Sequence, residues 1–206
     1  MRFMCFTGTA LMAALTLMSC TEESDALELD EDGLTADVRE LIPYVVIDGL
    51  KEVGHPIYGG TNPPDLTGSY LMDPLVFTST NLPGDTFTLG TVITSQSMVI
   101  SDQSSDLALA VSFTPVGRGT SHADRSFIVG DDCRFTVFSE YAVVTPAGSP
   151  WSNLMVFSGC LSDAGIEDAA VTYVLLADRD EIFLPYREPG QGRTFTDANG
   201  LAEREQ

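Results

Sequence analysis

Apolar and polar residues alternate along much of the chain after Gly68. The alternation is clearest in residues 107–113, 135–143 and 171–177. A period of two is typical of a β-strand with one buried face. Runs bounded by glycine, proline and asparagine predict further strands at residues 69–79, 91–100, 125–130, 152–160 and 193–196. About eight short strands predict an all-β domain, folded as a single antiparallel β-barrel or, alternatively, as a β-sandwich.

A helical spacing precedes these strands. Between residues 37 and 53 the apolar residues fall near one stripe: Val38, Leu41, Ile42, Val45, Val46 and Leu50. Asp37 followed by Glu40 resembles a capping box. Pro43 disfavours a continuous helix, so we expect a short N-terminal helix that is kinked or begins after Asp37.

The first twenty residues follow a third pattern. Met1 and Arg2 precede an uncharged run from Phe3 to Ser19, which matches the core of a signal peptide and is too short to span a bilayer. The run ends in Leu17-Met18-Ser19-Cys20, which resembles the lipobox of bacterial lipoproteins. The resemblance implies that residues 1–19 are removed and that acyl chains such as palmitate on Cys20 anchor the protein in the membrane. An ordinary signal peptide and a buried N-terminal helix are the alternatives.

The lipobox resemblance also implies a location in the bacterial cell envelope. Thr21 is not the aspartate associated with inner-membrane retention in enteric bacteria. Glu22 and Glu23 resemble the acidic pairs that accompany surface export in Bacteroidetes. We therefore expect the outer membrane, at its periplasmic face or at the cell surface.

An acidic segment follows the predicted anchor. Residues 21–32 carry seven acidic residues and no basic one, and such a run repels itself and stays extended. We expect residues 20–36 to be a linker and residues 37–206 to be the domain. Glu28, Asp30, Asp32 and Gly33 are spaced like the first half of an EF-hand loop. Arg39 then falls where that loop needs its bidentate glutamate, which favours a solvated linker over a calcium site.

Charge narrows the choice of partners. The chain has 30 acidic and 10 basic residues, a net charge of −20, and residues 41–206 alone hold 21 acidic and 8 basic residues, a net charge of −13. Nucleic-acid binding and a polybasic membrane patch both need a basic surface, so we expect neither. A neutral or cationic ligand suits this surface better than an anionic one.

The cysteines predict one disulfide. Cys5 lies in the signal segment and Cys20 in the lipobox, which leaves Cys133 and Cys160 as a pair in an exported chain. Their midpoint, 146.5, falls in the Pro146–Pro150 turn cluster, as expected for a hairpin. This register places Cys133 and Cys160 on one face with Phe135, Val137, Leu154 and Val156. A bulge, a diagonal pairing or two reduced buried thiols are the alternatives.

A second resemblance rests on two stretches of sequence. They are Gly54-x-x-Ile57-Tyr58-x-Gly60-x-x-Pro63-Pro64-x-Leu66-x-Gly68-x-Tyr70 and Arg193-x-Phe195-x-Asp197-x-Asn199-Gly200. Both resemble runs in uncharacterised bacterial lipoproteins with lipocalin-like barrels, although Tyr70 stands where a true lipocalin has tryptophan. The resemblance implies a closed barrel that could enclose a lumen, and it names no ligand.

Candidate catalytic residues are few. His55 and His122 lie 67 positions apart, and neither has another histidine or cysteine at the spacing of a zinc site. Ser121, His122 and Asp124 are too close in sequence to form a triad easily. The carboxylate clusters Asp131-Asp132 and Asp178-x-Asp180-Glu181 could serve acid–base chemistry or bind a cation, but solvated turns are favoured in so acidic a chain.

We therefore expect a non-enzymatic, membrane-anchored domain without a cofactor that binds a small neutral or apolar ligand, or a partner. The alternatives are a surface-interaction protein with a packed barrel and a cation-dependent enzyme that uses the acidic clusters. The alternating faces of residues 107–113, 135–143 and 171–177 are the expected walls of a lumen. Inward-facing Ala108, Ala110 and Ser112 would leave room for a ligand, whereas large inward residues would fill the barrel.

Overall fold

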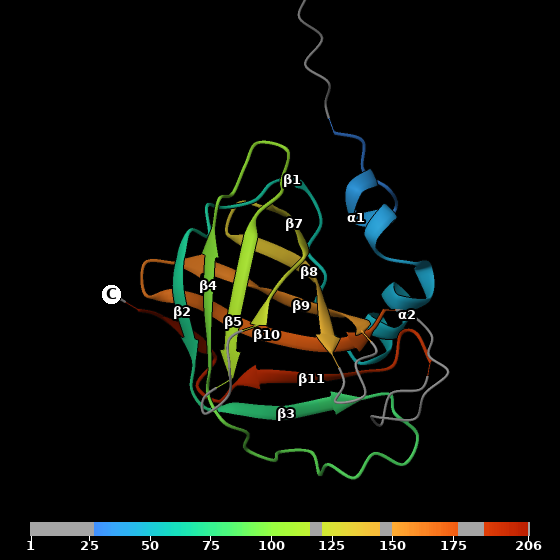
Figure 1. The fold of residues 1–206 in the computed structure, drawn as a ribbon. Helices are drawn as coiled ribbons and strands as arrows, with labels where there is room; N and C mark the ends of the chain where they lie inside the picture. Colours follow the sequence, from blue (N-terminus) through green and yellow to red (C-terminus); the bar gives the residue numbers. More distant parts are fainter. Residues whose placement is uncertain (1–26, 116–120, 145–149, 177–187, 206) are drawn as a thin grey trace, which may run out of the picture.

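The computed structural model describes residues 27–115, 121–144, 150–176 and 188–205. Most of these residues lie in β-strands, which confirms the all-β class (Figure 1). The helices are α1 (Ala36–Leu41) and α2 (Tyr44–Glu52). The strands are β1 (Thr61–Asn62), β2 (Gly68–Met72), β3 (Leu75–Thr80), β4 (Gln96–Ser101), β5 (Ala110–Pro115), β6 (Ser121–His122), β7 (Arg125–Asp131), β8 (Arg134–Val144), β9 (Pro150–Ser162), β10 (Gly165–Leu175), β11 (Gly192–Asp197) and β12 (Leu201–Glu205).

The predicted helix is interrupted at Pro43, as expected. Pro43 is the N-cap residue of α2, a position where its missing N–H costs no helical hydrogen bond. α1 begins before Asp37, because the Thr35 hydroxyl accepts a hydrogen bond from the Val38 N–H and caps the helix instead of the expected capping box. The predicted stripe is buried except for Val45, which is half exposed.

One curled sheet contains all the strands of the described residues. Ten strands follow each other in the order β1-β7-β8-β9-β10-β12-β2-β4-β5-β6, and β11 and β3 branch from β10. In Figure 1, β2, β4 and β5 cross in front of the long strands β7 to β10. The alternative of a sandwich of two separate sheets is therefore wrong.

The predicted closed barrel of eight regular strands is also wrong. Between β5 and β7 the ladder is interrupted at a seam, formed by residues 107–113 and 121–128. Ser112 lies opposite His122, whereas Ala108 lies opposite Phe127, so the register shifts by one residue within the seam. A few backbone hydrogen bonds join its two sides, including those from Leu109 to Ser126 (3.2 Å) and from Ile128 to Leu107 (2.8 Å).

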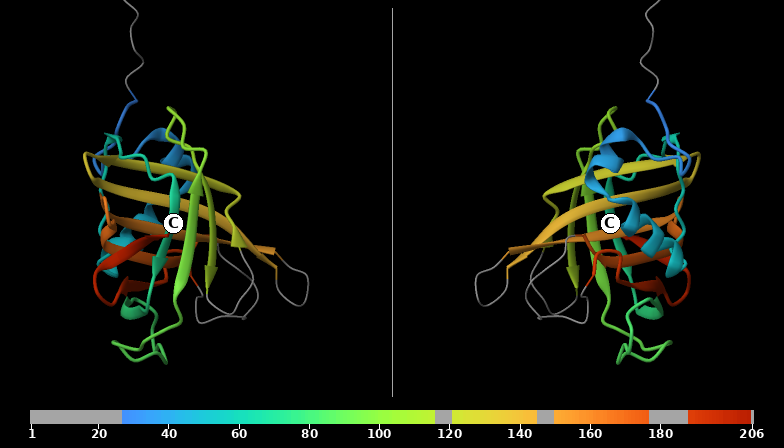
Figure 2. Two further views of the ribbon diagram at one scale, coloured as in Figure 1. Left: turned by 90° about the vertical axis from the view of Figure 1, so that its left-hand side faces the viewer. Right: turned by 90° about the vertical axis from the view of Figure 1, so that its right-hand side faces the viewer.

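The sheet buries side chains on both faces. Its inner face encloses one apolar core, made of residues from the strands and from the connections before β2 and β5. Its outer face at β7 to β10 is covered by α1 and α2, whose Val38, Val46 and Leu50 share a second core with Phe138 and Val156. Figure 2 shows the helices against this outer face. Alternation along a strand separates the two cores.

The expected linker is partly folded onto the domain. Residues 20–26 lie outside the described residues, but Leu34 and Thr35 are buried. Arg39 forms ion pairs with Asp30 and Asp32, and Lys51 forms one with Asp32 (2.6 Å). The prediction that residues 21–32 stay extended is therefore wrong for Asp30 and Asp32, because Arg39 and Lys51 neutralise the repulsion between their carboxylates. Arg39 binds the carboxylates that the EF-hand spacing offered to calcium.

Candidate functional site

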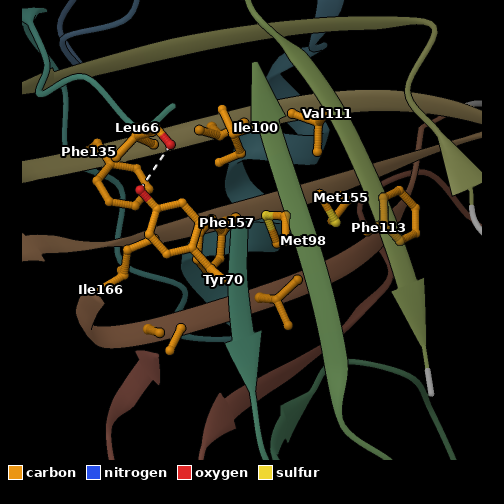
Figure 3. Close-up of a cluster of buried hydrophobic side chains, with 14 of the residues drawn as sticks. Leu66, Tyr70, Met98, Ile100, Val111, Phe113, Phe135, Met155, Phe157 and Ile166 are labelled. Atoms are coloured by element: carbon orange, nitrogen blue, oxygen red, sulfur yellow. Dashed lines mark hydrogen bonds between the residues drawn. The ribbon is translucent and has the colours of Figure 1, made fainter. Parts of the chain in front are cut away.

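The interior of the curled sheet has an apolar end. Aromatic and branched side chains fill it, and the Tyr70 hydroxyl donates a hydrogen bond to the Leu66 carbonyl (2.9 Å; Figure 3). The guanidinium of Arg204 lies 5.1 Å from the centroid of the Tyr70 ring and donates a hydrogen bond to its hydroxyl (3.0 Å). The rings of Phe135 and Phe157 pack at 5.6 Å between centroids. Side chains therefore fill this end of the interior, as expected for a packed barrel.

The opposite end of the interior is polar and aromatic. We call it the polar end and define it by Gln96, Phe113, Tyr141, Asn153 and Tyr173. The Phe113 ring lies 5.1 Å from that of Tyr141 and 6.2 Å from that of Tyr173, and the two tyrosine rings lie 6.4 Å apart. Figure 3 places Phe113 at the side of the core far from Leu66 and Tyr70. Three strands, β5, β8 and β10, thus bring three rings together.

Hydrogen bonds connect the polar groups of this end. The Tyr173 hydroxyl donates to Gln96 Oε1, and Gln96 Nε2 contacts the Met155 sulfur at 3.8 Å. Asn153 Nδ2 donates to the Tyr141 hydroxyl (3.3 Å). Gln96 and Asn153 are 2% and 6% exposed, so water has little access to either amide.

One polar atom of this end has no hydrogen-bond partner. It is Asn153 Oδ1, a buried carbonyl oxygen. Among the described residues, one other buried side-chain nitrogen or oxygen has no partner. It is Arg39 Nη1 of α1, which lies on the outer face of the sheet. An unsatisfied buried acceptor costs about 1–3 kcal/mol, so its presence calls for an explanation. A hydrogen-bond donor that enters the polar end would remove this cost.

A second buried polar cluster lies on the outer face of the same strands. His55 Nε2 is 2.9 Å from Ser158 Oγ, and His55 Nδ1 is 2.8 Å from Thr172 Oγ1. Thr172 Oγ1 is 2.7 Å from Thr194 Oγ1, and Ser158 donates to Thr136 Oγ1 (3.1 Å). Burial lowers the pKa of His55 to about 3, so the imidazole is neutral at physiological pH.

The His55 cluster resembles a catalytic serine–histidine pair, but its hydrogen bonds are complete. The imidazole is bonded to Ser158 and Thr172 through both ring nitrogens, so neither nitrogen is free to act on a substrate. A proton on Nε2 donated to Ser158 and a Thr172 hydroxyl donated to Nδ1 satisfy both ring nitrogens. The cluster fastens the connection after α2 to the sheet. From the sequence, His55 was considered only as a zinc ligand or catalytic residue, and this buried role was missed.

The structure contains the predicted disulfide. Cys133 and Cys160 are bonded, with their Cα atoms 4.7 Å apart. The predicted register is wrong by one residue, because Cys160 lies opposite Arg134. Phe135 and Val137 therefore face the inner core, while Val156 faces the helices. A shift of one residue exchanges the inner and outer faces of one strand relative to the other.

The small residues that would leave room for a ligand if they faced inward do not line the interior. Ala110 is exposed, and Ala108 and Ser112 are half-buried. Their neighbours Val111 and Phe113 fill the interior instead. The three predicted wall segments do supply the inner face, since Val137, Val171 and Phe113 all belong to the inner core.

The predicted acidic clusters do not converge on a site in the described structure. Asp131 and Asp132 are exposed at the β7–β8 turn, while Asp178, Asp180 and Glu181 lie outside the described residues. His122 is exposed and bonds to Ser112 Oγ (2.8 Å). Within residues 27–115, 121–144, 150–176 and 188–205, no three His, Cys, Asp or Glu side chains are placed to hold a metal ion. Cys20 also lies outside the described residues.

Sequence reasoning missed the two amides. Gln96 lies in the predicted strand 91–100 and Asn153 in the predicted strand 152–160, and the sequence predicts no further role for either residue. One signal was available for Asn153. It lies two residues before the apolar Met155, so alternation places this polar side chain on the same face as Met155. Without the register of β9 against β8, that parity could not be used.

Comparisons with known proteins add no relative. The chain matches no protein-family model, no curated protein and no solved structure. None of the helices in the described residues is long and apolar enough to cross a membrane. The functional argument therefore rests on the site itself.

Proposed function

We propose that this protein is a non-enzymatic lipoprotein of the bacterial cell envelope that binds a small molecule at the polar end of its β-domain. The observation that carries the proposal is Asn153 Oδ1, a buried acceptor without a partner among aromatic rings. A domain whose interior served only stability would gain by an apolar residue there. The lipocalin-like resemblance of the sequence is consistent with a ligand in the interior.

The lipobox supports the membrane anchor. Cys20→Ala should abolish labelling with palmitate. Once residues 1–19 are removed from this variant, the protein should appear in the soluble fraction and not in the membrane fraction. Cys5→Ala, in the segment expected to be removed, is the matched control and should label normally. Unchanged palmitate labelling of Cys20→Ala would refute the anchor.

Binding is tested with N-phenyl-1-naphthylamine, a neutral fluorescent probe. The detergent-solubilised full chain should bind it saturably and with one site, against micelles alone as the blank. Ser126 is buried and bonds to Ser139 on the inner face of β7 and β8 (2.9 Å). Ser126→Leu should therefore reduce binding by narrowing the interior, whereas Ala110→Leu on the exposed side of β5 should not. Circular dichroism must show both variants folded.

An exposed apolar loop favours a second candidate, a surface-interaction protein. Phe87, Leu89 and Val92 are 42%, 63% and 62% exposed in the connection between β3 and β4. The loop is held in place, because Arg193 makes two hydrogen bonds to the Asp85 carboxylate and lies over the Phe87 ring. If the probe does not bind, photo-crosslinking from Leu89 in whole cells distinguishes a docked partner from a free loop.

A further inference from the structure

We infer that the ligand of the polar end is a small neutral aromatic molecule that donates a hydrogen bond, of the phenol or indole class, and that Asn153 Oδ1 accepts this bond. The inference rests on the proposed function, because it names the ligand class of the same site. It narrows the sequence-based expectation of a small neutral or apolar ligand.

The hydrogen-bond donor follows from the bonding of Asn153. Its Nδ2 already donates to the Tyr141 hydroxyl at 3.3 Å, while its Oδ1 has no partner. Asn153 precedes Met155 and Phe157 by two and four residues on β9, and both belong to the inner core, so the asparagine side chain also faces the interior. The group that completes the site must therefore donate a hydrogen bond to the carbonyl oxygen of Asn153.

The aromatic character follows from the rings beside Asn153. Tyr141 bonds to Asn153, and its ring lies edge-on to Phe113 (82° between planes) and to Tyr173 (83°). Edge-to-face contacts between rings are favourable at such centroid distances. A further planar ring can form the same edge-to-face contacts, whereas an alkyl chain gains only the burial of its apolar surface.

Neutrality follows from charge and burial. None of the five residues that define the polar end is charged, and Gln96 and Asn153 are nearly inaccessible to water. A buried ion without an opposite charge loses its hydration and gains no compensation. The net charge of −13 over residues 41–206 repels anions in addition.

Two pairs of probes test the hydrogen bond. Phenol and anisole have similar shapes, as do indole and 1-methylindole, but the second member of each pair lacks the donor. Equilibrium dialysis of the detergent-solubilised full chain, with equal detergent on both sides, measures binding without bias from micelles. We expect the donor to bind about tenfold more tightly than its methylated analogue, the usual effect of one buried hydrogen bond.

Asn153→Leu should abolish this selectivity by raising the dissociation constant of the donors and leaving that of the analogues. Asn62→Leu, at an exposed asparagine on β1, makes the same change away from the interior and should keep it. Asn153→Ala replaces the leucine variant if circular dichroism shows that variant unfolded.

The outcomes separate the two proposals. Equal binding of donor and analogue to the native chain, or tighter binding of the analogue, overturns the donor assignment while the binding function stands. Selectivity that survives in Asn153→Leu overturns the role of Asn153. If neither probe pair binds while N-phenyl-1-naphthylamine saturates, the ligand class is wrong. If none of these molecules binds, the proposed function fails and the inference fails with it.

Discussion

Two buried polar clusters lie on opposite faces of β8, β9 and β10, and they differ in how completely they are hydrogen-bonded. On the outer face, His55 uses both ring nitrogens and connects to hydroxyls on four strands. On the inner face, Asn153 uses its amide nitrogen and leaves its carbonyl oxygen without a partner. The side chains of His55 and Asn153 are both less than a tenth exposed.

The difference indicates what each cluster contributes. A complete buried network stabilises one arrangement of the chain and has no capacity for a further group. An incomplete network keeps an unmet interaction that a ligand can supply. Polarity and burial are common to both clusters, so completeness of hydrogen bonding is the property that separates the structural cluster from the candidate binding site.

The largest expected effect comes from breaking the complete cluster. His55→Ala should lower the free energy of unfolding by about 3 kcal/mol, because it leaves a cavity and removes partners from the Ser158 and Thr172 hydroxyls. Urea unfolding followed by circular dichroism measures this. His122→Ala, at an exposed histidine, should change stability by no more than about 0.5 kcal/mol. Equal losses in the two variants would contradict a structural role for His55.

Acid should weaken the same cluster. Burial lowers the pKa of His55 from 6.5 to about 3 in the folded protein. Between these values the unfolded chain binds a proton that the folded chain does not. The stability contribution is therefore complete above pH 6.5 and falls by about 1.4 kcal/mol for each pH unit between pH 6.5 and about pH 3.

Urea titrations at pH 6.5 and at about pH 5 should show a loss of roughly 2 kcal/mol in the native chain. His55→Gln cannot take up this proton and should show a much flatter profile. A native-like slope in the glutamine variant would assign the pH dependence to other groups.

The smallest expected effect is on the free energy of unfolding, which should change in opposite directions when a polar residue of each cluster is replaced by an apolar one. Ser158→Ala should destabilise the protein by about 1–2 kcal/mol, because a buried His55 N–H loses its acceptor. Asn153→Leu should leave the ligand-free protein unchanged or stabilise it by about 1 kcal/mol, because it removes an unsatisfied carbonyl. Parallel urea unfolding of both variants checks this, and a clear loss in Asn153→Leu would show that its carbonyl is satisfied.

Much of the local structure could be predicted from the chain. Alternation in residues 107–113, 135–143 and 171–177 marks β5, β8 and β10, and the proline at position 43 marks the break between α1 and α2. Three strands were missed: the two-residue strands β1 and β6, and the longer β12. Strand β12 was missed because Leu201–Glu205 is mostly charged and exposed. Its backbone pairs with β10 and β2 without the apolar pattern that reveals a half-buried strand.

The site was less predictable than the strands. Tyr141 and Tyr173 lie in predicted wall segments, but Gln96 and Asn153 gave no signal by themselves. The hairpin of β8 and β9 shows why: its register was misjudged by one residue, and that slip exchanges inner and outer faces. On β5, the alternation likewise left open which face points inward, and the structure places Ala110 on the exposed face.

The sequence by itself determined most strand and helix segments, the cysteine pair and the acidic composition, because each depends on residues near one another or on the residue content of the chain. Tertiary structure decided which face of each strand is interior and which polar groups find partners. His55 and Ser158 are 103 positions apart, and Gln96 and Met155 are 59 apart. Hydrogen bonding in a folded chain depends on such long-range contacts, so the complete cluster and the incomplete one could be told apart only after folding.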